Sequence, residues 1–137
     1  MKRVTGIGGV FFKTKDPKVT KEWYAKHLGF VTDDYGASFT FRKTENPDKN
    51  GYLQWSPFKE DTDYFAPSQK EFMINYRVEN LVELVKALEE EGVTICDEIE
   101  SFDYGKFVHI LDNDGNKIEL WEPIDEVFNQ YYSEKKE

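Results

Sequence analysis

One short predicted strand carries the residues best suited to chemistry or ligand binding. The side chains of a strand alternate between its two faces, so within residues 117–122 Glu119 and Trp121 share one face. The preceding Asp114-Gly115-Asn116 is typical of a tight turn, because glycine and asparagine tolerate the positive φ that such turns require. A carboxylate beside an indole indicates either a solvated sheet edge or the wall of a binding cavity.

Other groups that could do chemistry are few. The chain has 2 histidines and 1 cysteine, and it contains no phosphate-binding loop or recognisable catalytic triad. Cys96 lies in an apolar, predicted strand, where a buried thiol is unreactive. His109 also lies on a predicted strand, and a hydrogen-bonded histidine of the core or sheet face is the simpler interpretation there. Covalent catalysis therefore has no support in the sequence.

The composition limits the partners. A chain of 137 residues with 11 Phe, 8 Tyr and 3 Trp has the length and apolar bulk of one globular domain. Its net charge of −9 repels phosphate backbones and anionic lipids, so we expect neither a nucleic acid nor a membrane as partner. One cysteine excludes an internal disulfide, and no apolar segment is long enough to span a membrane. We expect a cytoplasmic protein.

The elements that must position Glu119 form two similar modules. Each begins with a strand and a capped helix: Asp16 and Gly29 bound the first helix, Asn80 and Gly92 the second. The remaining strands are expected within residues 30–34, 37–43 and 51–55 and then within 93–102, 106–112 and 117–122. Trp55-Ser56-Pro57 in the first module matches Trp121-Glu122-Pro123 in the second. Such a repeat indicates two βαβββ modules in an α+β fold.

The predicted domain is single and spans residues 1–137. Module one covers about 4–57, a connector 58–71, module two about 72–123 and a last helix 124–136. We expect the first helix to pack through Val19, Trp23 and Leu28, with Tyr24 flanking this stripe. The apolar stripe of the last helix is expected to pack against its own module, although a lid or a dimer contact would also fit; it comprises Ile124, Val127, Phe128, Tyr131 and Tyr132.

The two modules carry three motifs: Asp16-Pro17, Trp23-Tyr24 before Leu28-Gly29-Phe30, and Asp-Gly-Asn-Lys-Ile-Glu-Leu at 114–120. Two such modules with these motifs resemble the vicinal oxygen chelate superfamily. That superfamily includes glyoxalases, bleomycin-resistance and fosfomycin-resistance proteins, and extradiol dioxygenases. The resemblance covers nearly the whole chain. It implies a curved, cupped mixed sheet with the functional site in the cup, and a homodimer, because a second subunit usually completes the cup. Fold alone does not assign the function.

In metal-using members of the superfamily the cup holds one divalent ion, bound by the first and last strand of each module. The resemblance places these ligands at Gly9 and Met73 on the first strands and at Glu119 on the last strand. The fourth falls at Leu53, or at Gln54 if that strand is shifted by one residue. Glycine offers no side chain, a thioether suits copper(I), and one carboxylate is too few for zinc or non-haem iron. We therefore expect no metal and no cofactor.

Strand alternation predicts the lining of the cup. The candidate ligand-binding residues are Phe11, Lys13, Trp55, Met73, Asn75, Arg77, His109, Glu119 and Trp121. A cationic ligand would be held by the aromatic rings and the carboxylate, whereas an anionic ligand would be held by Lys13 and Arg77. These two bases could also simply pair with nearby acids. The sequence does not choose between the two ligand charges.

Three functions follow from these expectations. The first is a metal-independent binding protein of the bleomycin-resistance type, holding a partly aromatic small molecule. The second is a lyase or isomerase that uses Glu119 as general base, or one with an atypical divalent metal site. The third is a regulatory or interaction domain whose cup is filled by its own side chains.

Overall fold

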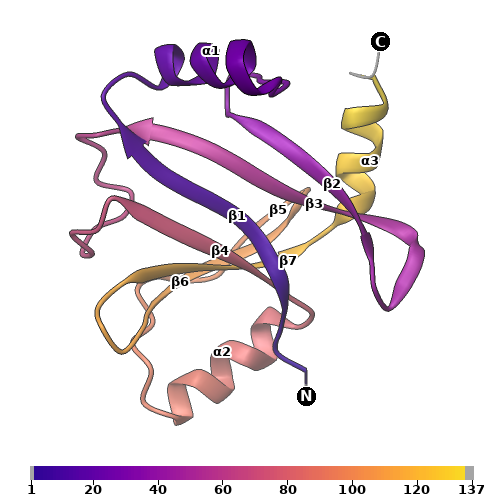
Figure 1. The fold of residues 1–137 in the computed structure, drawn as a ribbon. Helices are drawn as coiled ribbons and strands as arrows, with labels where there is room; N and C mark the ends of the chain where they lie inside the picture. The colour runs from indigo at the N-terminus through magenta and orange to yellow at the C-terminus, as the bar shows by residue number, and fades with distance from the viewer. Residues whose placement is uncertain (1, 135–137) are drawn as a thin grey trace.

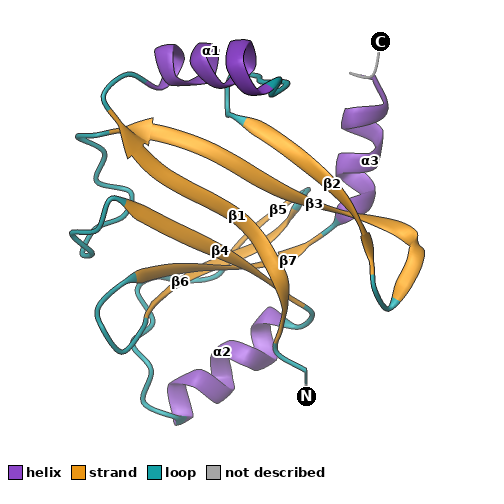
Figure 2. Ribbon diagram, in the orientation of Figure 1, coloured by secondary structure: helices purple, strands orange, loops and turns teal. Residues whose placement is uncertain are grey.

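One mixed seven-stranded sheet runs through both halves of the chain and carries the three helices (Figures 1 and 2). The computed structural model describes residues 2–134, with side chains up to residue 129. The elements are β1 (Val4–Thr14), α1 (Pro17–Leu28), β2 (Ala37–Lys43), β3 (Asn46–Lys59), β4 (Phe72–Val78), α2 (Leu81–Glu90), β5 (Glu100–Phe102), β6 (Gly105–Leu111), β7 (Lys117–Pro123) and α3 (Asp125–Glu134). The strand order is β2-β3-β1-β4-β7-β6-β5.

The two modules join edge to edge within one chain. β1 pairs antiparallel with β4, with Gly9 opposite Asn75 and Phe11 opposite Met73. On either side of this seam the pairing is parallel, β1 with β3 and β4 with β7. The sheet curves, and α1 and α2 lie outside it at its two ends (Figure 1). This arrangement confirms the predicted α+β, glyoxalase-like fold.

Both predicted N-terminal helix caps form. Asp16 Oδ1 accepts hydrogen bonds from the backbone N–H groups of Lys18 and Val19, at 3.1 and 3.3 Å. Gly29 ends α1 in the left-handed conformation, with φ +73°. In α2 the Asn80 side chain accepts from Glu83 N at 3.3 Å. The local sequence alone is therefore sufficient to set where these helices begin.

The main apolar core lies between α2 and the outer face of module two. Its buried members are Val78, Leu81, Leu84, Val85, Val108, Ile110 and Leu120. These residues come from α2 and from three adjacent strands, so the core fixes β4, β6 and β7 against one another. The opposite faces of the same strands are left free to line the cup.

The first helix packs through a different stripe from the predicted one. Val19, Trp23 and Leu28 are 57%, 53% and 59% exposed. Tyr24 instead takes the inward position, because its ring meets those of Trp55 and Phe30 with centroids 4.6 and 5.1 Å apart. The outer face of α1 is left apolar and open to solvent.

Several strands differ from their predicted bounds. Residues 30–34 and 93–96 contribute only single bridges, Thr32 to Ala37 and Ile95 to Ile110. Conversely, β3 begins well before the predicted strand 51–55, within the polar sequence Thr-Glu-Asn-Pro-Asp-Lys-Asn at 44–50, and it ends inside the predicted connector. Polar composition indicated a loop, but an exposed hairpin is solvated and tolerates the same residues. None of the helices in the described chain has the length and apolarity needed to cross a bilayer.

Candidate functional site

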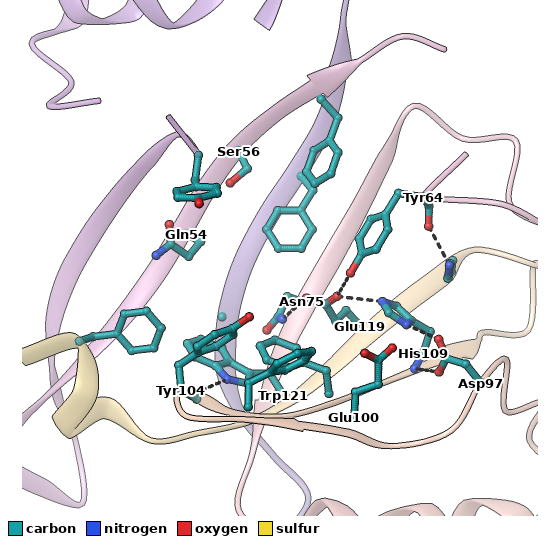
Figure 3. Close-up of a pocket in the computed structure, with 18 of the residues that line it drawn as sticks. Gln54, Ser56, Tyr64, Asn75, Asp97, Glu100, Tyr104, His109, Glu119 and Trp121 are labelled. Carbon is teal, nitrogen blue, oxygen red and sulfur yellow. Dashed lines mark hydrogen bonds and ion pairs between the residues drawn. The ribbon is translucent and has the colours of Figure 1, made fainter. Parts of the chain in front are cut away.

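The concave face of the sheet encloses a cavity of about 950 Å³ (Figure 3). Most of its wall is aromatic, from Phe11, Tyr35, Phe58, Tyr64, Phe102, Tyr104, Phe107, Trp121 and Phe128. A volume of this size is at the upper end of the roughly 300–1,000 Å³ typical of small-molecule sites. The cup is therefore not filled by its own side chains.

A row of cup-facing residues crosses five strands at the floor of the cavity. Gln54 lies opposite Gly9, and Gly9 opposite Asn75, across the seam between the modules. Asn75 in turn lies beside Glu119, and Glu119 beside His109. Because directly opposed residues share a face of the sheet, all the side chains of this row point into the cup. This row carries the polar side chains at the floor of the cavity.

This register decides one of the positions that the resemblance left open and corrects another. Gln54 rather than Leu53 is the cup-facing residue of β3 in this row. Asn75 rather than Met73 is the counterpart of Gly9. Counting seven residues back from each helix cap gave Met73, but Asn75 lies only five residues before Asn80. Met73 is instead fully buried, in a cluster with Phe11 and Phe65.

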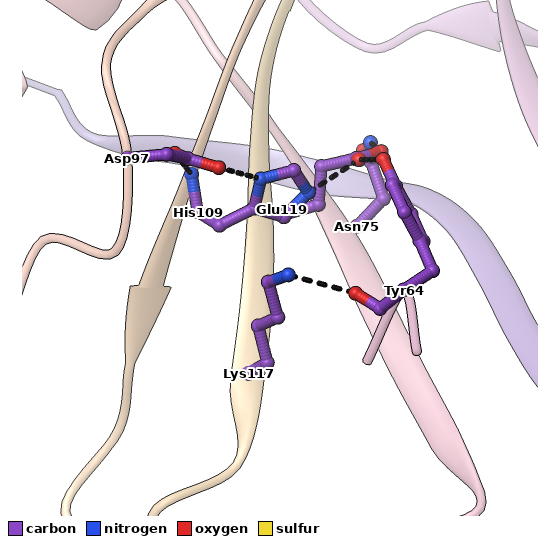
Figure 4. A network of polar contacts seen from close by, with 6 residues as sticks. All are labelled: Tyr64, Asn75, Asp97, His109, Lys117 and Glu119. Atoms are coloured by element: carbon purple, nitrogen blue, oxygen red, sulfur yellow. Dashed lines mark hydrogen bonds and ion pairs between the residues drawn. The ribbon is translucent and has the colours of Figure 1, made fainter. Parts of the chain in front are cut away.

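The Glu119 carboxylate is the centre of a buried polar network (Figure 4). Its Oε1 accepts from Asn75 Nδ2 at 2.7 Å, and its Oε2 accepts from the Tyr64 hydroxyl at 2.6 Å. His109 Nε2 lies 2.8 Å from the same Oε2, and His109 Nδ1 lies 2.6 Å from Asp97 Oδ2. Donors therefore take three of the roughly four lone-pair sites of this carboxylate.

The two carboxylates favour the charged form of His109. Burial lowers the pKa of the imidazole, but the hydrogen bonds and charges of Glu119 and Asp97 outweigh burial, so the pKa of His109 is raised. Burial, followed by the charge and hydrogen bond of Glu119, also raises the pKa of Tyr64. Its phenol consequently remains a hydrogen-bond donor throughout the ordinary pH range.

The glycines of β1 lie where other side chains approach the backbone closely. A Cβ on Gly8 would lie 2.3 Å from Asn75 Oδ1 and 2.9 Å from the Trp121 ring. The strand register has an irregularity between Ile7 and Gly9, which places Gly8 in a bulge facing the cup. The buried Asn75 Oδ1 has no hydrogen-bond donor among the described residues.

Trp55, expected in the cup, lies on the opposite face of the sheet. Its ring packs against Phe30 and Phe12, with centroids 4.8 and 5.3 Å apart, as well as against Tyr24 beneath α1. The reason is the alternation of the strand: once Gln54 faces the cup, its neighbour must face away. Aligning Trp55-Ser56-Pro57 with Trp121-Glu122-Pro123 therefore gave a register for β3 that is wrong by one residue.

The two predicted bases do not line the cavity either. Arg77 is 5% exposed; its Nη2 bonds to Asp125 Oδ2 at 2.5 Å and its Nη1 donates to Tyr52 O at 3.1 Å. Lys13 Nζ lies over the Phe65 ring, 5.7 Å from its centroid. Of the other predicted ligand-binding residues, Phe11, Asn75, His109, Glu119 and Trp121 do line the cavity.

Other contributors to the cavity come from segments that strand alternation does not place over the sheet. Tyr64 comes from the predicted connector, Asp97 and Glu100 from the segment before β6, and Phe128 from α3. Strand periodicity identifies residues on a sheet face but says nothing about which loops cover that face. The density of tyrosine and acidic residues in these segments was the only available indication.

The sequence profile of the Glyoxalase/Bleomycin resistance protein/Dioxygenase superfamily matches residues 6–120, which span both modules. The chain belongs to this superfamily. No curated protein matches the sequence well enough to count as a relative. The superfamily assignment therefore depends on the profile and the fold, and not on a characterised homologue.

Solved structures with this superfamily fold align over most of the chain. Methylmalonyl-CoA epimerase from Mycobacterium tuberculosis is 19% identical with a TM-score of 0.60, over 92% of this chain and 93% of that chain. A Streptomyces coelicolor methylmalonyl-CoA epimerase variant with 2-nitronate-propionyl-CoA is 17% identical with a TM-score of 0.63, over 88% and 99%. The Mn(II)-bound glyoxalase from Novosphingobium aromaticivorans is 18% identical with a TM-score of 0.60, over 89% and 40%. Such low identities show a shared fold alone.

The divalent ion typical of the superfamily does not fit the residues of this cup. Within residues 2–129 no group of three or more His, Cys, Asp or Glu side chains is arranged to hold an ion. The row offers one carboxylate and two amides, and it has no side chain at Gly9. Both nitrogens of His109 are already directed at carboxylates. Three oxygen or nitrogen ligands of the usual kind are therefore not available.

Proposed function

We propose that this protein binds a partly aromatic small molecule in its cup without a metal, as the bleomycin-resistance type of its superfamily does. The observation that carries the proposal is the open cavity of about 950 Å³ with an aromatic wall and a single hydrogen-bonded carboxylate at its floor. Aromatic walls bury large ligand surfaces, and a few fixed polar groups orient the ligand.

The hydrogen bonds of Glu119 favour binding over catalysis. A general base needs a lone pair aimed at the proton it removes. Here Asn75, Tyr64 and His109 already occupy most of the lone pairs of Glu119. Such a carboxylate is well suited to orienting a ligand and poorly suited to abstracting its proton.

Tryptophan fluorescence tests the binding function. Trp121 is 2% exposed and stacks on Phe107 in the cavity wall, whereas Trp23 and Trp55 lie outside the cavity. In a Trp23→Phe/Trp55→Phe variant, all tryptophan emission comes from Trp121. We expect a panel of two- and three-ring aromatic compounds to include saturable quenchers. The matched Trp23→Phe/Trp121→Phe variant, which keeps Trp55, should show no saturable change.

The metal part of the proposal has its own measurement. Protein purified without chelator is expected to contain no stoichiometric divalent ion by elemental analysis. Dialysis against EDTA, and then addition of magnesium, manganese or zinc, should leave the ligand Kd unchanged within about twofold, because no ion takes part in binding. A factor of two corresponds to about 0.4 kcal/mol. Binding that requires an added ion would overturn metal independence while leaving ligand binding intact.

A proton-transfer enzyme, an isomerase or lyase, is the second candidate. It is favoured by the chain Asp97–His109–Glu119, in which an imidazole facing the cavity is held between two carboxylates. The solved structures similar to this chain include methylmalonyl-CoA epimerases. The test is incorporation of solvent deuterium into methylmalonyl-CoA or another acidic C–H compound, followed by NMR. Exchange that Glu119→Gln abolishes would favour this candidate over simple binding.

A cytoplasmic homodimer without nucleic acid or membrane partners remains our prediction for the whole protein. The open apolar face of α1, with Val19, Trp23 and Leu28 exposed, supports an association of two chains. Sedimentation at micromolar concentration should give twice the mass of one chain. Trp23→Lys should shift the protein toward the monomer, and a wild-type protein sedimenting as a single chain would contradict the dimer.

A further inference from the structure

The lining of the cup is strongly acidic as well as aromatic. Its carboxylates are Asp33, Asp34, Asp97, Glu98, Glu100 and Glu119. They come from three separate segments: the loop before β2, the segment that leads into β5 together with the first residue of β5, and β7. Carboxylates on several sides of an aromatic cavity create a negative potential inside it, and the low dielectric of the walls strengthens that potential.

The positive groups near the cavity are already engaged. Lys117 is the one lysine or arginine among the cavity-lining residues described; its Nζ donates to Tyr64 O at 2.7 Å and lies over the Tyr64 ring. His109 is held between two carboxylates. Arg77, which would have received an anion, is bound to Asp125. An anionic ligand would therefore meet one lysine, Lys117, among six lining carboxylates.

Glu100 is one of the lining acids outside the Glu119 network. Its side chain is exposed at the cavity wall, and its carboxylate forms no hydrogen bond or ion pair with another described residue (Figure 3). Its charge contributes, after burial and Glu119, to raising the pKa of Tyr64 and Tyr104. The Glu100 carboxylate lines the same cavity as the Tyr64 and Tyr104 rings.

A second observation at the floor of the cavity concerns hydrogen bonding. Asn75 is 2% exposed, and its Nδ2 is fixed on Glu119. Its Oδ1 packs against Gly8 beside the Trp121 and Arg77 side chains and has no donor among the described residues. Buried acceptors normally have a donor, so the floor of the cup keeps one unsatisfied acceptor.

We propose that the ligand is an organic cation, an aromatic amine whose ammonium group is held by Glu100 and by the aromatic rings of the cavity wall. This inference depends on the proposed binding function and specifies the ligand class. Aromatic rings attract cations through their negative faces, and the attraction is strongest where water is excluded. The unpaired carboxylate supplies the opposite charge, and the ring system of the ligand would pack on the aromatic wall of the cup.

A matched trio of compounds tests the charge directly by isothermal titration calorimetry. Naphthylmethylamine is a cation near neutral pH, naphthylmethanol is its neutral analogue, and naphthoate is an anion of similar size. We expect the amine to bind about tenfold tighter than the alcohol, and the naphthoate to bind more weakly than either. The preference should decrease as salt is raised, because salt screens exposed charges.

Charge-removing variants locate the site. Glu100→Gln should weaken the amine about three- to tenfold and leave the alcohol within about twofold, since an exposed pair contributes on the order of 1 kcal/mol. Glu90→Gln removes the same charge from the exposed end of α2 and should change neither affinity. Equal binding of all three compounds, or tighter binding of naphthoate, would overturn the cation inference and leave small-molecule binding standing. If none of the three binds, the binding function itself is overturned.

Discussion

Gly8 is the residue that lets Asn75 and Trp121 come together at the floor of the cup. A methyl group there would meet Asn75 Oδ1 at 2.3 Å and Trp121 at 2.9 Å, and neither neighbour is free to move. Asn75 is hydrogen-bonded to Glu119, and Trp121 Nε1 donates to Tyr104 O at 3.2 Å. The size of one side chain on β1 therefore controls the geometry of the polar network.

Gly8→Ala should consequently destabilise the fold by about 1–3 kcal/mol, the usual range for overpacking. Gly6→Ala is the matched control: it lies on the same strand, and its nearest contact would be Arg77 Cδ at 4.0 Å. Urea unfolding of both variants measures the difference. A Gly8→Ala variant as stable as Gly6→Ala would contradict the close approach.

His109 makes the stability of the fold depend on pH. Its pKa is raised in the folded protein, so its stabilisation is fully present below the unfolded value of about 6.5 and is lost as pH rises through the folded value. The difference in unfolding free energy between wild type and His109→Gln should thus be largest near about pH 6 and decrease toward alkaline pH. Urea unfolding across this range measures it, and a difference that grew with pH would show that the neutral imidazole is the stabilising form.

At the scale of elements, α3 is a wall of the cavity held by one buried ion cluster. Val127 and Phe128 line the cavity, and the Phe128 ring packs on Trp121 and Tyr52, each with centroids 5.6 Å apart. Asp125 is 3% exposed and anchors the start of the helix to Arg77 and to Lys43, whose Nζ is 2.7 Å away. Helix α3 thus contacts β2 and β3 of module one as well as β4 and β7 of module two, whereas packing against its own module was predicted. Tyr131, Tyr132 and the last residues of 124–136 lie outside the side chains described.

Asp125→Asn should destabilise the protein by about 3 kcal/mol, because it leaves the buried Arg77 without its opposite charge. Hydrogen exchange of the α3 amides should accelerate at the same time, since the anchor of the helix is lost. Glu126→Gln, one residue further along the same helix and exposed, is expected to change stability by less than about 0.5 kcal/mol. Equal effects of the two substitutions would show that the ion cluster does not hold α3.

At the scale of the whole molecule, the β1–β4 seam makes the two modules one cooperative unit. The backbone ladder joins them, and the buried cluster of Phe11, Met73 and Phe65 draws on β1, β4 and the segment between the modules. Neither module can thus expose its seam without losing hydrogen bonds and buried apolar area.

Chemical unfolding should therefore show one transition wherever it is observed. Trp55 on β3 reports on module one and Trp121 on β7 reports on module two. Two variants, each keeping one of these tryptophans and replacing the other two by Phe, should give unfolding curves with the same fractional progress at every urea concentration. A midpoint for Trp55 clearly below that for Trp121 would show that module one unfolds separately.

The sequence by itself determined the elements whose signals are local. Asp16, Gly29 and Asn80 act through hydrogen bonds and backbone angles within a few residues, so the ends of α1 and the start of α2 could be predicted. The repeated modules gave the fold class, and alternation on β7 placed Glu119 and Trp121 on one face. These properties depend on neighbours along the chain.

Only the tertiary structure decided what surrounds Glu119. Whether Gln54 or Leu53 faces the cup depends on hydrogen-bond register between strands, and a one-residue shift exchanges the two faces. The pairing of Arg77 with Asp125 and the placing of Tyr64 and Glu100 over the cup join residues far apart in the sequence. The charge of the ligand site depends on which of these groups contact one another in the folded protein. Their spacing along the chain does not predict those contacts.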